Sequence, residues 1–146
     1  MAAQRFASNE EAVAYMRQVA VARSGFSNWL AVEPVRVWEG RSELLLHLRP
    51  EMTQHHGFAH GAIVGLMADN ACAWAGASVL GDVVTGGYTI NFLAPATGKT
   101  LRAKGEVVKA GKRQAVVRAD VWSEDGDAGE ERLVATALAT ILPVGA

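Results

Sequence analysis

The stretch HGAIVGLMADNACAWAGA, from His60 to Ala77, decides the fold of this chain. It is built almost wholly from small apolar residues, yet it carries one carboxylate, Asp69, near its middle. A helix that is apolar on nearly every side must be enclosed by other elements, and a strongly curved sheet could wrap it. The stretch therefore predicts a long, buried, central helix.

A membrane-spanning helix is the alternative for this segment, because residues 61–80 are about as many as a bilayer crossing needs. Asp69 and Asn70 would then lie in mid-membrane, where a charge is expensive, and Gly and Ala outnumber Leu and Ile there. The sequence favours the buried helix, and we expect no membrane partner.

Length and composition predict one domain covering residues 1–146. The chain is 50% hydrophobic but only 7% aromatic, so we expect a core of closely approaching backbones. A net charge of -1 with 20% charged residues argues against nucleic acid as a partner. The single cysteine, Cys72, excludes an internal disulfide framework, and the N-terminus lacks the order of a secretion signal. We expect a cytoplasmic protein.

The rest of the pattern predicts one short helix and six strands. Ser8 and Glu11 form a capping-box signature that begins a helix at about 9–23. Residues 34–50 alternate around the turn Glu39–Gly40 as a hairpin, and a loop at 52–61 precedes the long helix. Four strands follow, expected as an antiparallel meander, at 85–95, 100–109, 114–123 and 132–143. This order predicts an α+β hot-dog fold, a curved antiparallel sheet wrapped around a long central helix.

Three segments in succession resemble the motifs of the PaaI-like hot-dog acyl-CoA thioesterases. They are HGAIVGLMADNACAWA, TGGYTINFLAPATGKTL and VVKAGKR, and the resemblance covers residues 54–142. The residues in register are His60, Gly61, Asp69, Asn91, Phe92, Pro95 and Gly111. Two residues differ from the family pattern: Gln54 stands for its usual Asn, and Ala62 for its second Gly.

The resemblance implies an enzyme that hydrolyses an acyl-CoA thioester to a free acid and coenzyme A. It needs no cofactor, and its sites lie at the interface of a homodimer, or of a dimer of dimers. The amide of Gln54 would orient water or substrate, and Thr85 aligns with a hydroxyl residue that helps to place water. Asn91 and Pro95 would contact the substrate.

The chemistry can also be examined residue by residue. Gly61 opens the helix, so its free N–H lies at the positive end of the helix dipole and is a candidate oxyanion donor. Asp69, in apolar surroundings, is expected to have a raised pKa and to act as a base or as the attacking carboxylate. Eight residues of helix separate the two by about 12 Å, whereas catalytic groups meet within about 3 Å of the reacting atoms. A second chain must therefore complete the site.

Plainer interpretations stand beside these. Asp69 could cap a nearby loop, His60 could simply bond the loop backbone, and Thr85 is an ordinary strand residue. Cys72 is expected in the core, without an activating partner. His55, His56 and His60 lie in a loop containing Gly57, so we expect no metal site.

The turn KAGKR places Lys109, Lys112 and Arg113 around Gly111 in a net-acidic chain. It is either an ordinary hairpin turn or a contact for the phosphates of coenzyme A, which the resemblance favours.

Two other functions remain as alternatives. One is a non-catalytic acyl-CoA sensor, although the residues before Trp29 offer no basic cluster for DNA. The other is a hot-dog hydratase, whose Asp and His lie close together on a loop. The acyl group is open, since the large residues Trp29, Trp38, Trp74 and Tyr88 suit an aromatic pocket or core packing equally.

Overall fold

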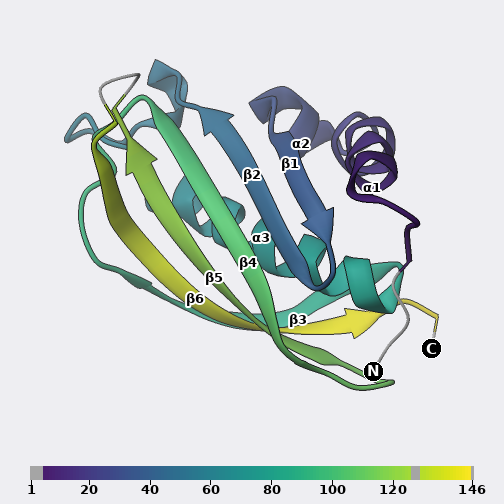
Figure 1. Ribbon diagram of the computed structural model, residues 1–146. Helices are drawn as coiled ribbons and strands as arrows, with labels where there is room; N and C mark the ends of the chain where they lie inside the picture. Colours follow the sequence, from purple (N-terminus) through teal and green to yellow (C-terminus); the bar gives the residue numbers. More distant parts are fainter. Residues whose placement is uncertain (1–4, 126–128, 146) are drawn as a thin grey trace.

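The computed structural model describes residues 5–125 and 129–145. One antiparallel sheet curves around the helix α3 (Gly61–Leu80), and the short helices lie beyond the first strand (Figure 1). The strands are β1 (Glu33–Trp38), β2 (Arg41–His47), β3 (Val83–Phe92), β4 (Thr100–Ala110), β5 (Ala115–Glu124) and β6 (Glu131–Pro143). This arrangement confirms the predicted hot-dog fold.

The order of the strands in the sheet is β1-β2-β4-β5-β6-β3, with every pair antiparallel. The strands β4, β5 and β6 form the expected meander, but the prediction was wrong for β3, which pairs with β6 at the far edge. Residues 93–99 do not make a tight turn into β4. They form a longer connection from the edge strand β3 to β4. Backbone hydrogen bonds from the Leu93 N–H to Val134 and from the Ala59 N–H to Ala96 hold this connection in place. One long side of β3 is therefore an edge of the sheet.

Small residues let α3 lie directly on the sheet. A Cβ added to Gly105 of β4 would lie 2.3 Å from the carbonyl oxygen of Ala71, and one on Gly76 would lie 2.8 Å from Ile141 of β6. The Ser42 hydroxyl donates to the same Ala71 oxygen at 2.6 Å. The Ala- and Gly-rich composition thus serves close approach between backbones, as expected.

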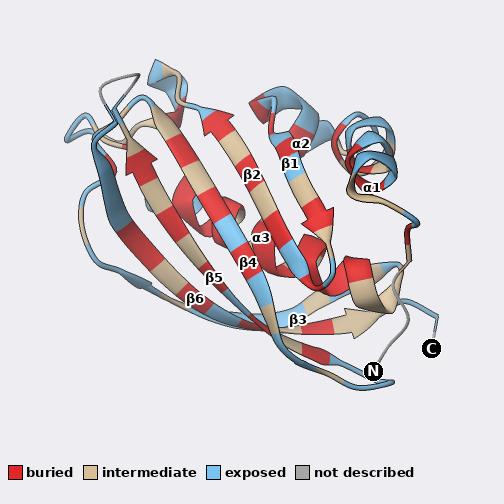
Figure 2. Cartoon of the chain, in the orientation of Figure 1, coloured by how far each residue is buried: buried red, intermediate tan, exposed pale blue. Residues whose placement is uncertain are grey.

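The sheet buries one face against α3. Figure 2 shows buried residues alternating with less buried ones along β2, β4 and β5, the pattern of a sheet with one face in the core. By length and composition α3 would suffice to cross a membrane, but 67% of its most apolar stretch is buried inside the protein. It is the core helix here.

The N-terminal region has more helix than the sequence predicts. Ser8 caps α1 (Asn9–Tyr15) by accepting from the Glu11 N–H, and the π-helix η1 (Met16–Val21) continues it close to the predicted end. A further helix, α2 (Gly25–Leu30), was not predicted; Ser24 caps it. A 3-10 turn, η2 (Pro50–Met52), begins the expected loop.

Candidate active site

The start of α3 presents an unused backbone donor. His60 is the N-cap residue, and its Nδ1 accepts from the Ala62 N–H at 2.9 Å. Gly61 is the first helical residue, and within residues 5–125 and 129–145 no acceptor takes its N–H. This N–H lies at the positive end of the dipole of a long helix and is available to an oxygen atom of a ligand.

A cavity of about 360 Å³ opens beside Gly61. Its walls come from the loop before α3, the start of α3, the segment that follows β3, and β6. Gln54 and Pro95 line it together with Gly61, so three of the predicted site residues share one cavity. The Gln54 side-chain oxygen accepts from the His56 N–H, which leaves the amide nitrogen as a donor. Apart from Gln54, the side chains that line this cavity are apolar.

Asp69 lies two helical turns further along α3 and is half-buried. Its carboxylate accepts a hydrogen bond of 2.6 Å from the Thr85 hydroxyl of β3. The structure thus joins a second pair of predicted residues. The plainer interpretation was that Asp69 caps a nearby loop. Its hydrogen-bond partner is instead a strand residue.

A β-bulge explains why Thr85 reaches α3. The register of β3 against β6 shifts between Thr85 and Gly87, which leaves Gly86 as an extra residue. Thr85 therefore lies on the same face of β3 as Tyr88 and Phe92, and all three pair with buried residues of β6.

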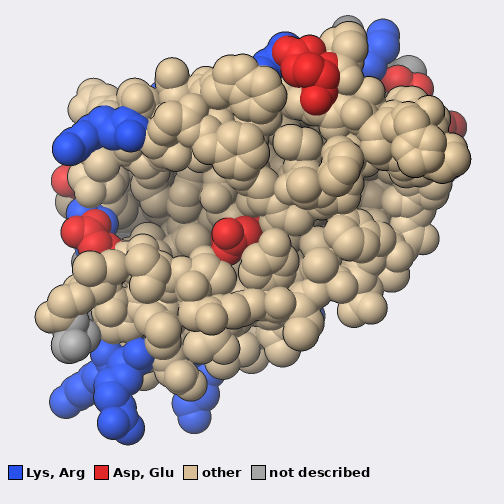
Figure 3. Space-filling model, turned by 180° about the vertical axis from the view of Figure 1, so that it is seen from behind, with Lys and Arg blue, Asp and Glu red and all other residues tan. Residues whose placement is uncertain are grey.

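That face of β3 lies over one stripe of α3. A Cβ on Gly61 would be 3.4 Å from the Phe92 ring, and one on Gly65 would be 3.3 Å from the Tyr88 hydroxyl. With the bond between Thr85 and Asp69, three successive turns of α3 each have their own partner on β3. Figure 3 shows this side of the molecule as mostly uncharged, with an isolated acidic group near its middle.

The remaining predicted residues lie apart from these two pairs or from each other. Eight residues of regular helix keep Gly61 and Asp69 about 12 Å apart along α3. Asn91 lies between Ile90 and Phe92 and pairs with Thr136, so it is on the opposite face of β3 from the cavity. His60 bonds the backbone, as its plainer interpretation predicts.

The predicted basic turn joins β4 to β5. A cleft of about 460 Å³ is lined by Lys109, Gly111, Lys112 and Arg113, and the Gly111 N–H donates to Gln114 at 2.9 Å. In the part of the chain that the structure describes, none of the three cations is paired with a carboxylate. Lys and Arg gather at the corresponding end of the molecule in Figure 3.

Cys72 lies in the core, as predicted. Burial, with a smaller contribution from the charge of Asp69, raises the pKa of its thiol to about 12. Its Sγ is 3.6 Å from the carbonyl oxygen of Val117. Among the described residues no three His, Cys, Asp or Glu side chains gather as metal ligands would.

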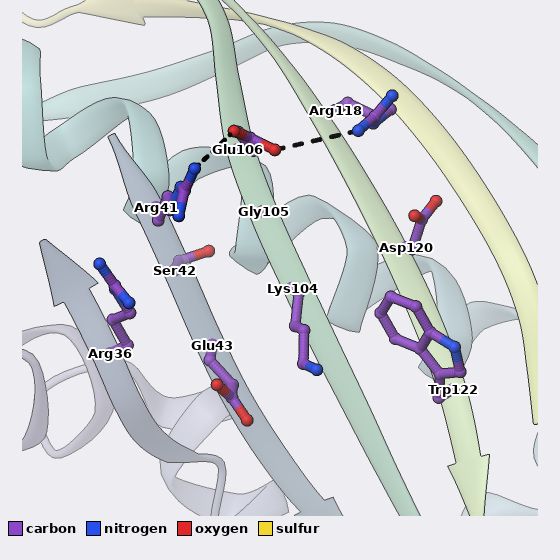
Figure 4. A pocket seen from close by; sticks show the side chains of 10 residues that line it. All are labelled: Arg36, Arg41, Ser42, Glu43, Lys104, Gly105, Glu106, Arg118, Asp120 and Trp122. Carbon is purple, nitrogen blue, oxygen red and sulfur yellow. Dashed lines mark hydrogen bonds and ion pairs between the residues drawn. The ribbon is translucent and has the colours of Figure 1, made fainter. Parts of the chain in front are cut away.

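A different hollow, of about 390 Å³, lies on the outer face of the sheet (Figure 4). Some of its charged groups have partners. Glu106 pairs with Arg41 at 3.2 Å and with Arg118 at 3.9 Å, while the Lys104 amino group lies over the Trp122 ring. The sheet separates this hollow from Gly61 and Asp69, so it is not part of the candidate site.

Sequence reasoning missed the side chains that shape the cavity. Phe58, Val64 and Val134 line it, whereas Trp29 is exposed and Trp74 is buried elsewhere in the core. None of these positions carries a local signal, because the cavity is assembled from four segments that are distant along the chain.

The model of the thioesterase superfamily matches residues 56–130 of this chain. No curated protein matches it. Among solved structures, a thioesterase family protein from Silicibacter pomeroyi is 33% identical, with a TM-score of 0.82, over 89% of this chain and 96% of the other.

Two further solved structures are similar. A conserved protein from Pseudomonas aeruginosa is 27% identical over 82% of this chain and 93% of its own, with a TM-score of 0.72. The PaaI protein from the phenylacetic acid degradation operon of E. coli is 22% identical over 94% of this chain and 97% of its own, with a TM-score of 0.80. The likeness to PaaI concerns the fold.

Proposed function

Because this chain belongs to the thioesterase superfamily, we propose that it hydrolyses acyl-CoA thioesters to a free carboxylic acid and coenzyme A. The observation that carries the proposal is the pair of chemically suited groups on one stripe of α3. Gly61 offers an unused N–H beside an apolar cavity, and Asp69 offers a half-buried carboxylate held by Thr85.

Each site takes Gly61 from one copy of the chain and Asp69 from another, because the two lie about 12 Å apart along the same rigid helix. The edge of β3 supports such an assembly. It is the long free edge of the sheet, and Val84, Phe92 and Leu93 on and beside it are each more than half exposed. A long edge strand with apolar side chains is a template for pairing with another chain.

Antiparallel pairing of two β3 edges about a two-fold axis would bring Gly61 of one copy close to Asp69 of the other. Along β3 the Thr85 end lies at Asp69 and the Phe92 end lies at Gly61. Pairing two such strands in opposite directions sets the Phe92 end of one copy beside the Thr85 end of its partner. Two equivalent sites result, each with one Gly61 and one Asp69.

The chemistry follows from these groups. The Gly61 N–H holds the thioester oxygen as negative charge develops on it. Asp69 either removes a proton from the attacking water or itself attacks the carbonyl carbon, and Thr85 fixes its orientation. The carbon–sulfur bond then breaks and the thiolate of coenzyme A takes up a proton. Where water attacked, the free acid leaves directly; where Asp69 attacked, water hydrolyses the anhydride between Asp69 and the acyl group, which releases the acid and restores the carboxylate. Gln54 donates from its amide to water or substrate in the cavity.

The basic turn supplies the binding of the nucleotide end of coenzyme A. Lys109, Lys112 and Arg113 carry charges that the described residues do not neutralise, in a chain whose net charge is -1. Coenzyme A carries phosphate groups that such a cleft would bind through charge-assisted hydrogen bonds.

Release of free thiol from a series of acyl-CoA thioesters tests the function. We expect turnover by the wild type, and for Asp69→Asn a turnover lower by about 100-fold or more. Asp82→Asn is the matched control, because Asp82 is exposed and, among the described residues, its carboxylate pairs only with Arg5 at the surface. Near-normal turnover by Asp69→Asn would remove Asp69 from the mechanism, and binding without release by the wild type would favour the acyl-CoA sensor.

A further inference from the structure

Tyr88 places a phenol hydroxyl against the middle of α3. A Cβ added to Gly65 would lie 3.3 Å from this hydroxyl, and Gly65 is one helical turn from Gly61 and one turn from Asp69. Tyr88 is 42% exposed, and its hydroxyl has no hydrogen-bond partner in the part of the chain that the structure describes. The proposed hydrolysis leaves this donor unused.

The free oxygen of the Asp69 carboxylate lies near the same turn. Its Oδ1 accepts from Thr85, whereas Oδ2 has no partner among the described residues and is open to solvent. The side chain of a helical residue leans over the preceding turn, which for Asp69 is the turn that contains Gly65. The carboxylate and the Tyr88 hydroxyl therefore border one patch of α3. No direct hydrogen bond joins them within the described ranges, and one water molecule on this patch could bond to both.

Gly65 leaves this patch without a side chain. Glycine destabilises the middle of a helix relative to alanine, so its presence at a buried helical position has a cost. Close packing explains Gly76, where an added Cβ would lie 2.8 Å from Ile141. At Gly65 the Tyr88 hydroxyl is the only atom of another element within 4 Å of the added Cβ, among the residues described. The small residue thus makes room beside a hydroxyl and a carboxylate rather than for a strand.

We propose that Tyr88 is a positioning residue of the hydrolysis: its hydroxyl and the Asp69 carboxylate of the same copy hold the attacking water over Gly65. The inference rests on the proposed function and gives Asp69 the role of base. The water donates one proton to Asp69 and accepts from Tyr88, which leaves its second lone pair for the carbonyl carbon. The Gly61 N–H of the other copy holds the carbonyl oxygen.

In this step the bond between the water oxygen and the carbonyl carbon forms, and one water proton passes to Asp69. The carbon–sulfur bond then breaks, and Asp69 returns the proton to the sulfur of coenzyme A. Tyr88 keeps its own proton throughout, so it acts only through the position of the water.

Tyr88→Phe keeps the ring and removes only the hydroxyl. We expect kcat for an acyl-CoA substrate of the wild type to fall about tenfold or more, with KM changed by less than about twofold. S-hexyl-CoA, a thioether that cannot be hydrolysed, should bind this variant as tightly as the wild type in calorimetry. Tyr15→Phe is the matched control, because the Tyr15 hydroxyl accepts from Arg5 at 2.8 Å in the N-terminal region. It should keep kcat within about twofold.

Gly65→Ala tests the same patch from the helix. Its methyl group should displace the water and lower kcat about tenfold, whereas the thermal midpoint should stay close to that of the wild type because alanine favours the helix. Gly25→Ala is the control, since nothing lies within 4 Å of its added Cβ. If Gly65 and Tyr88 act through one water, the double variant should be no slower than the slower single variant, whereas independent effects would multiply.

The outcomes separate this role from the proposed function. A wild type that hydrolyses no thioester would overturn the proposed function and this role with it. In a wild type that turns over, three results would overturn the role of Tyr88 and leave the proposed function intact. They are equal kcat in Tyr88→Phe and Tyr15→Phe, a parallel loss of kcat and of S-hexyl-CoA affinity in Tyr88→Phe, and multiplied losses in the double variant.

Discussion

At the scale of single residues, Gly61 contributes a backbone group rather than a side chain. That group can be removed without breaking the helix, because Gly61 is the first helical residue and its N–H has no partner among the described residues. Proline is well tolerated at this position of a helix. The preceding residue, His60, already has the extended conformation that proline requires, with φ -62° and ψ 140°.

Gly61→Pro should therefore fold but lose turnover by about 100-fold, the usual effect of removing one oxyanion donor. Gly61→Ala keeps the N–H and adds a methyl group 3.4 Å from Phe92, so it should retain most of the activity. Thiol release by the two variants, compared after circular dichroism has shown both folded, checks this. Equal turnover by the two variants would mean that the N–H has no catalytic role.

The buried thiol of Cys72 makes the free energy of unfolding depend on pH. Burial raises the pKa of its thiol to about 12, whereas a thiol in the unfolded chain ionises at about 8.5. Above that pH the unfolded chain loses a proton that the folded protein keeps, so the free energy of unfolding falls as pH rises toward 12.

Urea unfolding from pH 7.5 to 10.5 should show this difference. The wild type should lose up to about 1.4 kcal/mol per pH unit more than Cys72→Ala at the alkaline end, since lysines and tyrosines titrate in both proteins. Parallel profiles would show that the thiol ionises in the folded protein as readily as in the unfolded chain. Cys72→Ala should also keep its thioesterase rate within about twofold.

At the scale of elements, the contact of α3 with β4 depends on Gly105. Any Cβ there would lie 2.3 Å from the Ala71 carbonyl oxygen, which also accepts from Ser42. Gly105→Ala should destabilise the protein by about 3 kcal/mol or more, because backbone must move away from backbone and a buried hydrogen bond is strained.

Gly25→Ala is the control for this substitution, since nothing lies within 4 Å of its added methyl group. It should change the free energy of unfolding by less than about 1 kcal/mol. Chemical denaturation of both variants measures the difference. A stability of Gly105→Ala close to that of the wild type would show that α3 can shift on the sheet without cost.

The strand β3 marks the limit of what the sequence predicts. The alternation of apolar and polar residues predicts that this segment is a strand, and the apolar helix predicts a sheet that wraps around it. Both signals are local and periodic. The position of β3 beside β6 depends on a crossing by residues 93–99, which has no periodicity. The bond between Thr85 and Asp69 depends on a one-residue bulge at Gly86, and a single extra residue reverses the face of every side chain before it.

At the scale of the whole molecule, the site residues separate into groups that a single chain does not unite. Gly61 with Gln54 and Pro95, Asp69 with Thr85, and the turn around Gly111 occupy three places. The motif order in the sequence predicts which residues belong to the site. The spacing of Gly61 and Asp69 predicts that a second copy completes the site, but it does not predict how the two copies would pack, because contacts between chains leave no pattern within one sequence.

Mixing two inactive variants tests that sharing directly. Gly61→Pro removes the N–H and Asp69→Asn removes the carboxylate, so each should be nearly inactive alone. In a two-fold dimer with one chain of each kind, one site collects both defects and the other collects neither. Random co-refolding makes about half of the dimers mixed, so about a quarter of all sites should be intact. The mixture should then show about a quarter of wild-type turnover, provided that each variant has a folded spectrum and a dimeric mass. A mixture as inactive as its components would place Gly61 and Asp69 in the same site from one chain, against the separation that α3 imposes.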